Sequence, residues 1–254
     1  MLSFNWKHIA LILFDVAIAV YLVLAITVFN QPEDKAQVCT EVNINIVDGQ
    51  TRGLLSPAGI KQLLQKQRQY PLAQPMQFVS TRQIEETLLK NPFIAKAECY
   101  KTQNGHVAIE LQQRNPVLHV MATSGEQYYI DDEGVILPPS RYGGNLLVVT
   151  GVLTQKYALN NLLPVALHLS DNRFWQEQIE QLHVLADGTL EMVPRVGDHV
   201  VYFGPPTNIP QKLERLKKFY KYGLSQAGWN RYQRINVEFD NQIICKKAQL
   251  GNKS

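Results

Sequence analysis

The longest apolar stretch of the chain lies close to its first residue. Residues 9–29 are almost entirely apolar, and at about 1.5 Å of rise per residue such a helix crosses a hydrocarbon core of roughly 30 Å. A secretory signal peptide has a shorter apolar core and a small-residue cleavage site, whereas this run ends in Thr27-Val28-Phe29. The pattern therefore predicts an uncleaved transmembrane helix.

Charged residues around this run predict its orientation. Lys7 precedes it and an acidic pair with Lys35 follows it, which favours residues 1–8 in the cytoplasm and the bulk of the chain on the outer, periplasmic side of the cytoplasmic membrane. Asp15 is an ionisable residue inside the run, where a carboxylate costs roughly 2.5–3.5 kcal/mol. We expect either a contact of Asp15 with another membrane helix or a protonated or snorkelling side chain.

After a polar linker at residues 30–40, periodicity predicts a small module of strands and helices at residues 41–116. Its expected elements are a strand at 42–46, a helix that begins at Ser56-Pro57, a helix that begins at Ser80 or Thr81 and stops at Asn91-Pro92, and strands at 94–101 and 106–112. Asn104-Gly105 between the last two strands is a strong hairpin signal. The predicted order is strand, helix, helix, strand, strand.

Short apolar runs separated by turn residues predict a second module at residues 117–247, followed by a tail at 248–254. Strands are expected at 117–123, 127–131, 135–137, 179–186, 189–194, 199–203 and 234–239, with a helix at 159–169 that Pro164 breaks or shortens and a helix at 208–223 that Gly223 ends. The short connections favour an antiparallel sheet. The fold class is therefore α+β.

The end of the second module is expected to supply an edge strand of its sheet. In residues 234–239 the apolar side chains alternate with polar ones, and a two-residue turn at Asp240-Asn241 returns the chain as a last strand at 242–246. A strand added last by a hairpin leaves backbone donors and acceptors unpaired along one side. Those groups form a template for a strand from another protein.

Three polar groups admit both a chemical and a structural interpretation. Asp131, Asp132 and Glu133 precede Gly134 and fit a hairpin turn better than a metal loop or a catalytic carboxylate pair. Arg114 is interpreted as a surface charge. The helix at 208–223 carries basic residues that favour a solvated face over a lipid or wall-polymer contact: Lys212, Arg215, Lys217, Lys218 and Lys221.

Composition narrows the function classes. A formal net charge of +3 builds no basic stripe, which disfavours nucleic-acid binding. Cys39, Cys99 and Cys245 are widely spaced, so a zinc site is not expected, and one disulfide of undetermined pairing is allowed. The strings GxSxG, SxxK and HExxH are missing, and the six histidines show no metal-ligand spacing. We therefore expect no catalytic residues, no cofactor and no small-molecule substrate.

The first module resembles a polypeptide-transport-associated (POTRA) domain. The resemblance depends on its element order and on Ile84-Glu85, Asn91-Pro92-Phe93-Ile94 and Gln113-Arg114-Asn115-Pro116. Placed after a single predicted membrane helix, it resembles the FtsQ/DivIB family of bacterial cell-division proteins. Residues 129–137 also resemble the aromatic, apolar, Asp and Gly pattern of that family.

This resemblance implies a non-enzymatic scaffold of the divisome at the division septum. In the family, the last hairpin binds the partner proteins FtsB and FtsL, and the POTRA domain binds other division components. The residues implied as partner-binding here are Phe239, Asp240, Asn241, Gln242, Ile243, Ile244 and Lys246. Glu238 and Asn236 depart from the charges of the family pattern, so strand pairing is carried over and the family's salt bridge is not.

Two other functions fit the same sequence. One is a membrane-anchored envelope enzyme that acts on peptidoglycan through the carboxylates of residues 131–133. The other is an envelope-assembly protein that uses its POTRA module for docking.

Overall fold

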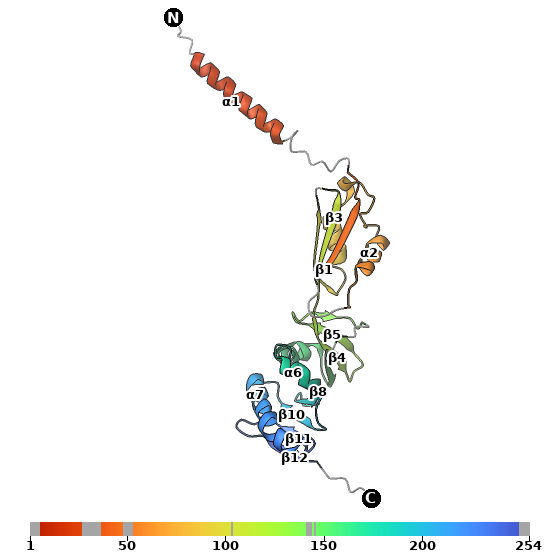
Figure 1. The fold of residues 1–254 in the computed structure, drawn as a ribbon, viewed down its shortest axis with the longest axis vertical. Coiled ribbons are helices and arrows are strands. Elements are labelled where there is room, and N and C mark those ends of the chain that lie inside the picture. The colour runs from red at the N-terminus through yellow and green to blue at the C-terminus, as the bar shows by residue number, and fades with distance from the viewer. Residues whose placement is uncertain are drawn as a thin grey trace.

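The computed structural model describes residues 6–26, 37–47, 53–102, 104–140, 144 and 146–248 of the 254-residue chain. Helix α1 (Trp6–Leu24) is followed by two modules of strands and helices that lie end to end (Figure 1). Each module has its own hydrophobic core. The predicted α+β fold is confirmed, with a three-stranded sheet in the first module and a nine-stranded sheet in the second.

The predicted membrane-spanning run, residues 9–29, lies partly outside the described residues. Within the residues that the structure describes, no helix has the length and hydropathy needed to cross a bilayer.

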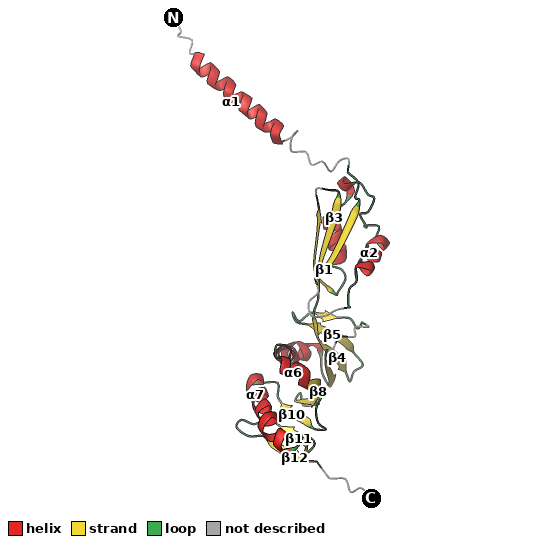
Figure 2. Ribbon diagram, in the orientation of Figure 1, coloured by secondary structure: helices red, strands yellow, loops and turns green. Residues whose placement is uncertain are grey.

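The first module has the predicted order of elements. Its elements are β1 (Glu41–Val47), α2 (Pro57–Lys66), the 3-10 helix η3 (Met76–Phe78), α3 (Thr81–Leu88), β2 (Ile94–Lys101) and β3 (His106–Gln113). The sheet order is β1-β3-β2, in which β1 is parallel to the central strand β3 and β2 is antiparallel to it (Figure 2). The return of the chain through α2 and α3 is what allows the parallel pair.

Local capping explains where both helices of this module begin. Ser56 Oγ accepts a hydrogen bond from Gly59 N at 3.1 Å, and Ser80 Oγ accepts one from Gln83 N at 3.4 Å. Glu85 of α3 contacts the sheet. Its Oε1 accepts a hydrogen bond from Cys99 N of β2 at 2.7 Å, so it ties α3 to the sheet.

All three cysteines lie within the described residues and are free thiols. Cys39 and Cys99 are buried in the core of the first module, whereas Cys245 is half-buried in the last strand. Burial, together with the nearby Glu85 carboxylate, raises the pKa of Cys99 to about 12. This thiol therefore stays protonated at neutral pH and acts as a small apolar side chain.

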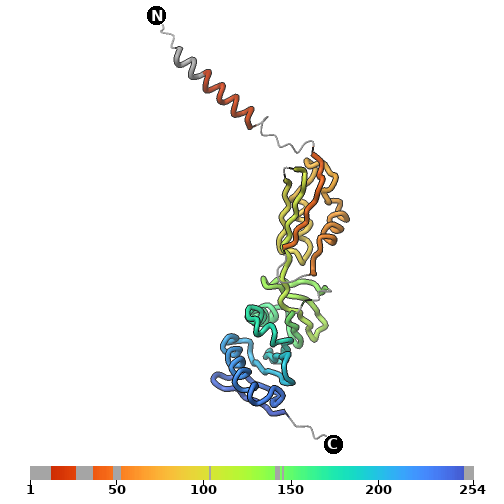
Figure 3. Tube along the Cα trace, in the orientation of Figure 1, coloured from red at the N-terminus to blue at the C-terminus, as the bar shows by residue number. Residues whose placement is uncertain are grey.

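The second module is a nine-stranded sheet with helices against it. Its strands are β4 (Pro116–Ala122), β5 (Gln127–Asp131), β6 (Ile136–Leu137), β7 (Leu147–Gly151), β8 (Ile179–Val184), β9 (Leu190–Pro194), β10 (Val200–Gly204), β11 (Tyr232–Asn236) and β12 (Ile244–Lys247), in the order β12-β11-β10-β9-β8-β7-β4-β5-β6. Its helical segments are α4 (Gln155–Tyr157), η4 (Ala158–Leu162), α5 (Leu163–Ser170), α6 (Arg173–Gln178), α7 (Ile209–Phe219), η5 (Tyr220–Leu224) and α8 (Ser225–Ala227). Contacts of α5 with β4 and of α6 with β8 place the helices on the sheet (Figure 3).

The sheet of the second module is mixed, so the prediction of an antiparallel domain was wrong in part. The meander of β8, β9 and β10 is antiparallel as predicted. The pairs β4–β7, β7–β8 and β10–β11 are parallel. Helical segments carry the chain across the sheet before β8 and before β11, and β5 and β6 intervene between β4 and β7. Strand β7, which lies between β4 and β8, was not predicted.

Two predicted helix boundaries also need correction. The helix expected at 159–169 begins earlier, at α4, and a π-helical turn precedes Pro164 near the start of α5. Pro164, which has no backbone N–H to donate, thereby falls in the first turn of α5, where that donor is not needed. Gly223 lies inside η5, and the helical segment ends at Gly228, whose φ of 94° is left-handed.

Gly151 at the end of β7 is the most closely packed of the glycines within the described residues. Its φ is 110°, and a Cβ there would lie 2.1 Å from Val184 O in the neighbouring strand β8. Gly125 has a similar φ of 91° but nothing within 4 Å of the Cβ position.

We expect Gly151→Ala to destabilise the second module by roughly 4 kcal/mol or more, because it adds a backbone clash to the strain of a positive φ. Gly125→Ala is the matched control and adds only the strain, about 1–2 kcal/mol. Urea denaturation of both variants measures the difference. Equal losses of unfolding free energy in the two variants would show that the clash with Val184 O does not destabilise the module.

Candidate functional site

Strand β12 is the edge of the nine-stranded sheet, as the sequence predicted. It pairs antiparallel with β11, and the register places Ile244 opposite Asn236, Cys245 opposite Ile235 and Lys246 opposite Arg234. In the part of the chain that the structure describes, no strand covers its other side. Backbone donors and acceptors along that side are therefore open to a strand from elsewhere.

Most of the predicted partner-binding residues face solvent around this edge. Phe239 is 44% exposed and Ile244 is 50% exposed, which leaves two large apolar side chains in contact with water. Ile243 is half-buried against the core, and the remaining positions are exposed: Asp240, Asn241, Gln242 and Lys246. The edge therefore combines open backbone, two apolar side chains and a polar surround.

The connection between β11 and β12 differs from the predicted hairpin. Strand β11 ends at Asn236, so residues 237–243 form a loop in place of a two-residue turn. Val237 is buried, whereas Phe239, expected on the same inner face, is 44% exposed. Within the loop, Glu238 N donates a hydrogen bond to Asn236 Oδ1 at 2.8 Å, and Asn241 adopts a left-handed φ of 61°.

Arg215 of α7 holds this loop, which the sequence reading missed. Its Nη2 donates a hydrogen bond to Val237 O at 2.8 Å, and its Nη1 lies 3.6 Å from Asp240 Oδ1. The side chain is only 18% exposed, so the prediction of a solvated charge at this position was wrong. A buried guanidinium that bonds to a loop carbonyl fixes the loop relative to the helix.

Lys212, one helical turn earlier, is also buried and contradicts the same prediction. Its Nζ donates a hydrogen bond to Pro205 O at 2.7 Å and lies 4.7 Å from the centre of the Phe203 ring. Burial lowers the pKa of Lys212, while the nearby Glu238 and Asp240 carboxylates oppose that shift. The spacing of Lys212 and Arg215 by three residues, beside the buried Leu216, is the signal that places both on the inner side of α7.

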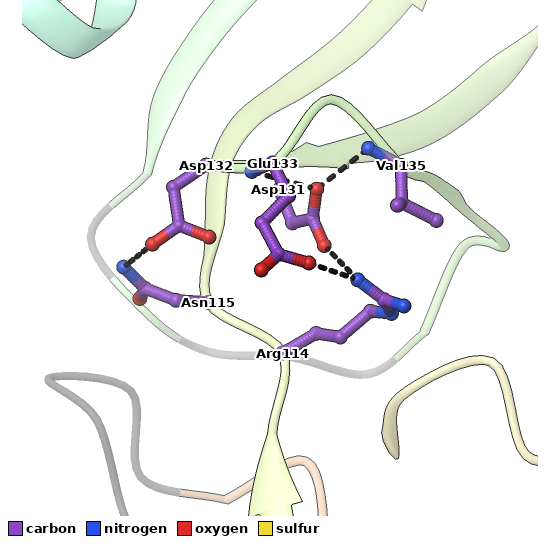
Figure 4. A network of polar contacts seen from close by, with 6 residues as sticks. All are labelled: Arg114, Asn115, Asp131, Asp132, Glu133 and Val135. Atoms are coloured by element: carbon purple, nitrogen blue, oxygen red, sulfur yellow. Dashed lines mark hydrogen bonds and ion pairs between the residues drawn. The ribbon is translucent and has the colours of Figure 1, made fainter. Parts of the chain in front are cut away.

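A second polar cluster lies at the joint between the modules and includes the acidic group that the sequence singled out (Figure 4). Arg114 Nη1 lies 2.8 Å from Asp131 Oδ2 and 3.0 Å from Glu133 Oε2. Asn115 Nδ2 donates a hydrogen bond to Asp132 Oδ2 at 3.1 Å. The two residues that lead from β3 into β4 are thus bonded to the turn that follows β5.

The Asp131 carboxylate is fully occupied by these contacts. It is 1% exposed, and its Oδ1 accepts hydrogen bonds from Glu133 N at 3.1 Å and from Val135 N at 2.6 Å. Arg114, interpreted from the sequence as a surface charge, is instead largely buried against it. Burial opposes the charge on Arg114, but the hydrogen bonds and attraction to Asp131 and Glu133 prevail and raise its pKa.

A groove of about 750 Å³ runs beside this cluster between the two modules. Its walls come from both: Val47, Ala95 and Gln112 on one side, and Leu147, Trp175 and Arg195 on the other. No histidine or cysteine lines it. Among the described residues, no group of three or more histidine, cysteine or carboxylate side chains is placed to hold a metal ion.

The histidines of the second module make structural contacts. His199 is buried, and its Nε2 lies 3.0 Å from the Tyr220 hydroxyl. Burial lowers the pKa of His199, so the ring is neutral at pH 7. His183 Nδ1 lies 2.8 Å from Thr150 Oγ1 between neighbouring strands.

Asp15, the predicted membrane-helix contact, lies exposed on α1. It is far in the sequence from both the edge and the joint, and the structure shows no contact that would assign it a role.

Two family models match the chain. A model described as FtsQ/DivIB, C-terminal related, matches residues 115–246, and a model described as POTRA-like domain matches residues 37–112. A curated relative, the cell division protein FtsQ of Geotalea daltonii (strain DSM 22248 / JCM 15807 / FRC-32), is 25% identical over 179 residues. That match covers 66% of this chain and 63% of the relative, so the chain spans less than two thirds of the length of that protein.

We expect Asp131→Asn to lower the free energy of unfolding by about 3 kcal/mol, because it leaves the largely buried Arg114 without its main counter-charge. Glu133→Gln is the matched control, since Glu133 is 70% exposed and its pair with Arg114 contributes less than about 1 kcal/mol. Urea denaturation followed by near-ultraviolet circular dichroism compares them. A larger loss in Glu133→Gln would contradict the assignment of Asp131 as the central partner.

Proposed function

This chain belongs to the FtsQ/DivIB family, and from that premise we propose that it is a non-enzymatic scaffold of bacterial cell division. It recruits partner division proteins through the open edge of its second module and through its POTRA-like module. The expected partners at the edge are membrane proteins of the FtsB and FtsL type. The curated relative is named as a cell division protein, which supports this role.

The observation that carries the proposal is the uncovered side of β12. A partner strand laid along it would extend the nine-stranded sheet through main-chain hydrogen bonds, with Phe239 and Ile244 as apolar contacts beside them. The bonds of Arg215 to the loop at 237–243 hold these groups before a partner arrives. Such preorganisation reduces the entropy lost on binding.

We also propose that the protein is held in the cytoplasmic membrane by a single helix at residues 9–29, with residues 1–8 in the cytoplasm. In α1 the apolar side chains at residues 13, 14, 16, 18, 20 and 22–24 are exposed, which suits contact with lipid better than contact with water. Anchoring two binding modules on the membrane of their partners raises the effective concentration of each contact. The proposed location is the division septum.

The contacts at the joint argue against the alternative of a peptidoglycan-acting enzyme. A general acid or base needs a carboxylate that reaches substrate, and Asp131 instead bonds to Arg114, Glu133 and Val135. The other alternative, a docking protein for envelope assembly, differs in location: it would be distributed over the envelope and not concentrated at the septum.

We expect Ile244→Pro to reduce partner binding at least about tenfold, because proline removes a backbone donor from the short edge strand. Ile244→Thr is the matched control, since it keeps the donor and the β-branched shape and should bind within about threefold of the parent. Co-purification of an FtsB-type partner from membranes measures both, and thermal unfolding checks that each variant is folded. Full binding by a folded proline variant would exclude the edge as the site.

The double variant Asp131→Asn, Glu133→Gln separates the scaffold from the enzyme. A scaffold that remains folded should still complement depletion of the wild-type protein in dividing cells, whereas an enzyme that uses these carboxylates should fail completely. Because Asp131→Asn is itself destabilising, the assay is run at a temperature at which the double variant is folded. Failure of the folded variant would favour the enzyme.

A further inference from the structure

The end of the first module where the described chain resumes after α1 carries exposed apolar side chains. Phe78 is 71% exposed, which is the highest value for any large apolar side chain within the described residues. Leu72 and Val38 are 43% and 45% exposed. We refer to Val38, Leu72 and Phe78 as the apolar tip.

The apolar tip is held rigidly by the backbone. Phe78 closes a turn of 3-10 helix, in which its N donates a hydrogen bond to Pro75 O at 2.9 Å. Hydrogen bonds of 2.8–2.9 Å join the two segments that carry the tip: Cys39 N to Gln74 O, Ala73 N to Cys39 O and Met76 N to Gln37 O. The exposure of Phe78 is therefore a property of an ordered segment.

The apolar tip lies at the end of the module opposite the joint. Strand β1 starts beside the tip and runs to Val47, which lines the groove between the modules. The turn between β2 and β3 lies at the tip end, where Thr40 N donates a hydrogen bond to Gly105 O at 3.0 Å. The second module occupies the other end, so it does not cover the tip (Figures 1 and 3).

The length of chain between α1 and the tip limits how far apart they lie. Only residues 27–36 separate the last described residue near α1, Ile26, from Gln37. At most about 3.6 Å per residue, this segment reaches roughly 36 Å when fully extended. If α1 is a membrane helix, as proposed above, the tip lies within that reach of the bilayer surface.

The segment that carries Leu72 and Phe78 suits a phospholipid surface by its charge, whereas Glu41 at the start of β1 is an exposed acidic residue on the side of Val38. Residues 67–79 contain no aspartate or glutamate, and their only charged side chain is Arg68, which is exposed. Nothing in this segment repels anionic headgroups, and an arginine near them is favourable. An aromatic side chain with aliphatic neighbours is typical of groups that enter the interfacial layer.

We propose that the apolar tip inserts into the interfacial layer of the bilayer on the outer side of the membrane. The first module then stands on the lipid surface with its long axis away from it, and the second module is held at a fixed height above the membrane. This proposal rests on the membrane anchor of the proposed function. Its partner is phospholipid, and a protein partner at the tip is an alternative that the test below detects.

The test uses the full chain in phosphatidylethanolamine and phosphatidylglycerol vesicles, with Phe78→Trp as the probe and brominated phospholipid as the quencher. Val152→Trp is the matched control, because Val152 is 57% exposed but belongs to the second module. The emission of the parent chain, which contains Trp6, Trp175 and Trp229, is subtracted from both. We expect brominated lipid to remove about half of the emission added at residue 78 and little of that added at residue 152.

The outcomes separate this proposal from that of the anchor. If alkaline carbonate leaves the chain in the vesicles but the emission of Phe78→Trp is not quenched, or is quenched no more than that of Val152→Trp, the tip does not contact lipid and the proposal is overturned. Protection of residue 78 from an aqueous quencher without quenching by brominated lipid would overturn it in favour of a protein contact, which in these vesicles is a second copy of the chain. If carbonate releases the chain and Phe78→Trp is still quenched by vesicles, the tip proposal stands and the anchor fails.

Discussion

A carboxylate that is almost completely withdrawn from water needs an opposite charge and hydrogen-bond donors to offset its burial, and Asp131 has both. Its partner Arg114 belongs to the two-residue passage from β3 to β4. The ion pair therefore fixes the direction in which the chain leaves one module and enters the other. The groove at the joint, the position of the nine-stranded sheet and the placement of its far edge all depend on that direction.

The first module could be predicted almost completely because its signals are local. Ser56 and Ser80 cap the two helices through their own hydrogen bonds. The alternation of apolar and polar residues in β1 indicates a sheet with one covered face. The second module was less predictable because parallel pairing depends on where distant segments meet. Strand β7 lies between β4 and β8 in the interior of the sheet, and only its neighbours in space reveal that position.

The candidate site also has one feature that could be predicted from the sequence and one that could not. The existence of a last strand at an open edge followed from the alternation of apolar residues in β11 and from the short distance to the end of the module. The geometry of the loop did not follow, because it depends on carbonyl groups at Pro205 and Val237 that attract Lys212 and Arg215 inward. From the sequence alone, a basic residue of a helix is expected in solvent. It turns inward where a backbone carbonyl group nearby can accept its hydrogen bond, and the sequence does not reveal that carbonyl group.

The positive charges at the end of β12 bear on self-association. Lys246 and Lys247 are exposed in a strand of only four residues. If two copies of this chain paired edge to edge about a two-fold axis, the antiparallel arrangement would bring lysines from both copies into one short ladder, where like charges repel. An acidic strand from another chain would not meet that repulsion, so the lysines disfavour edge-to-edge pairing of two copies of this chain.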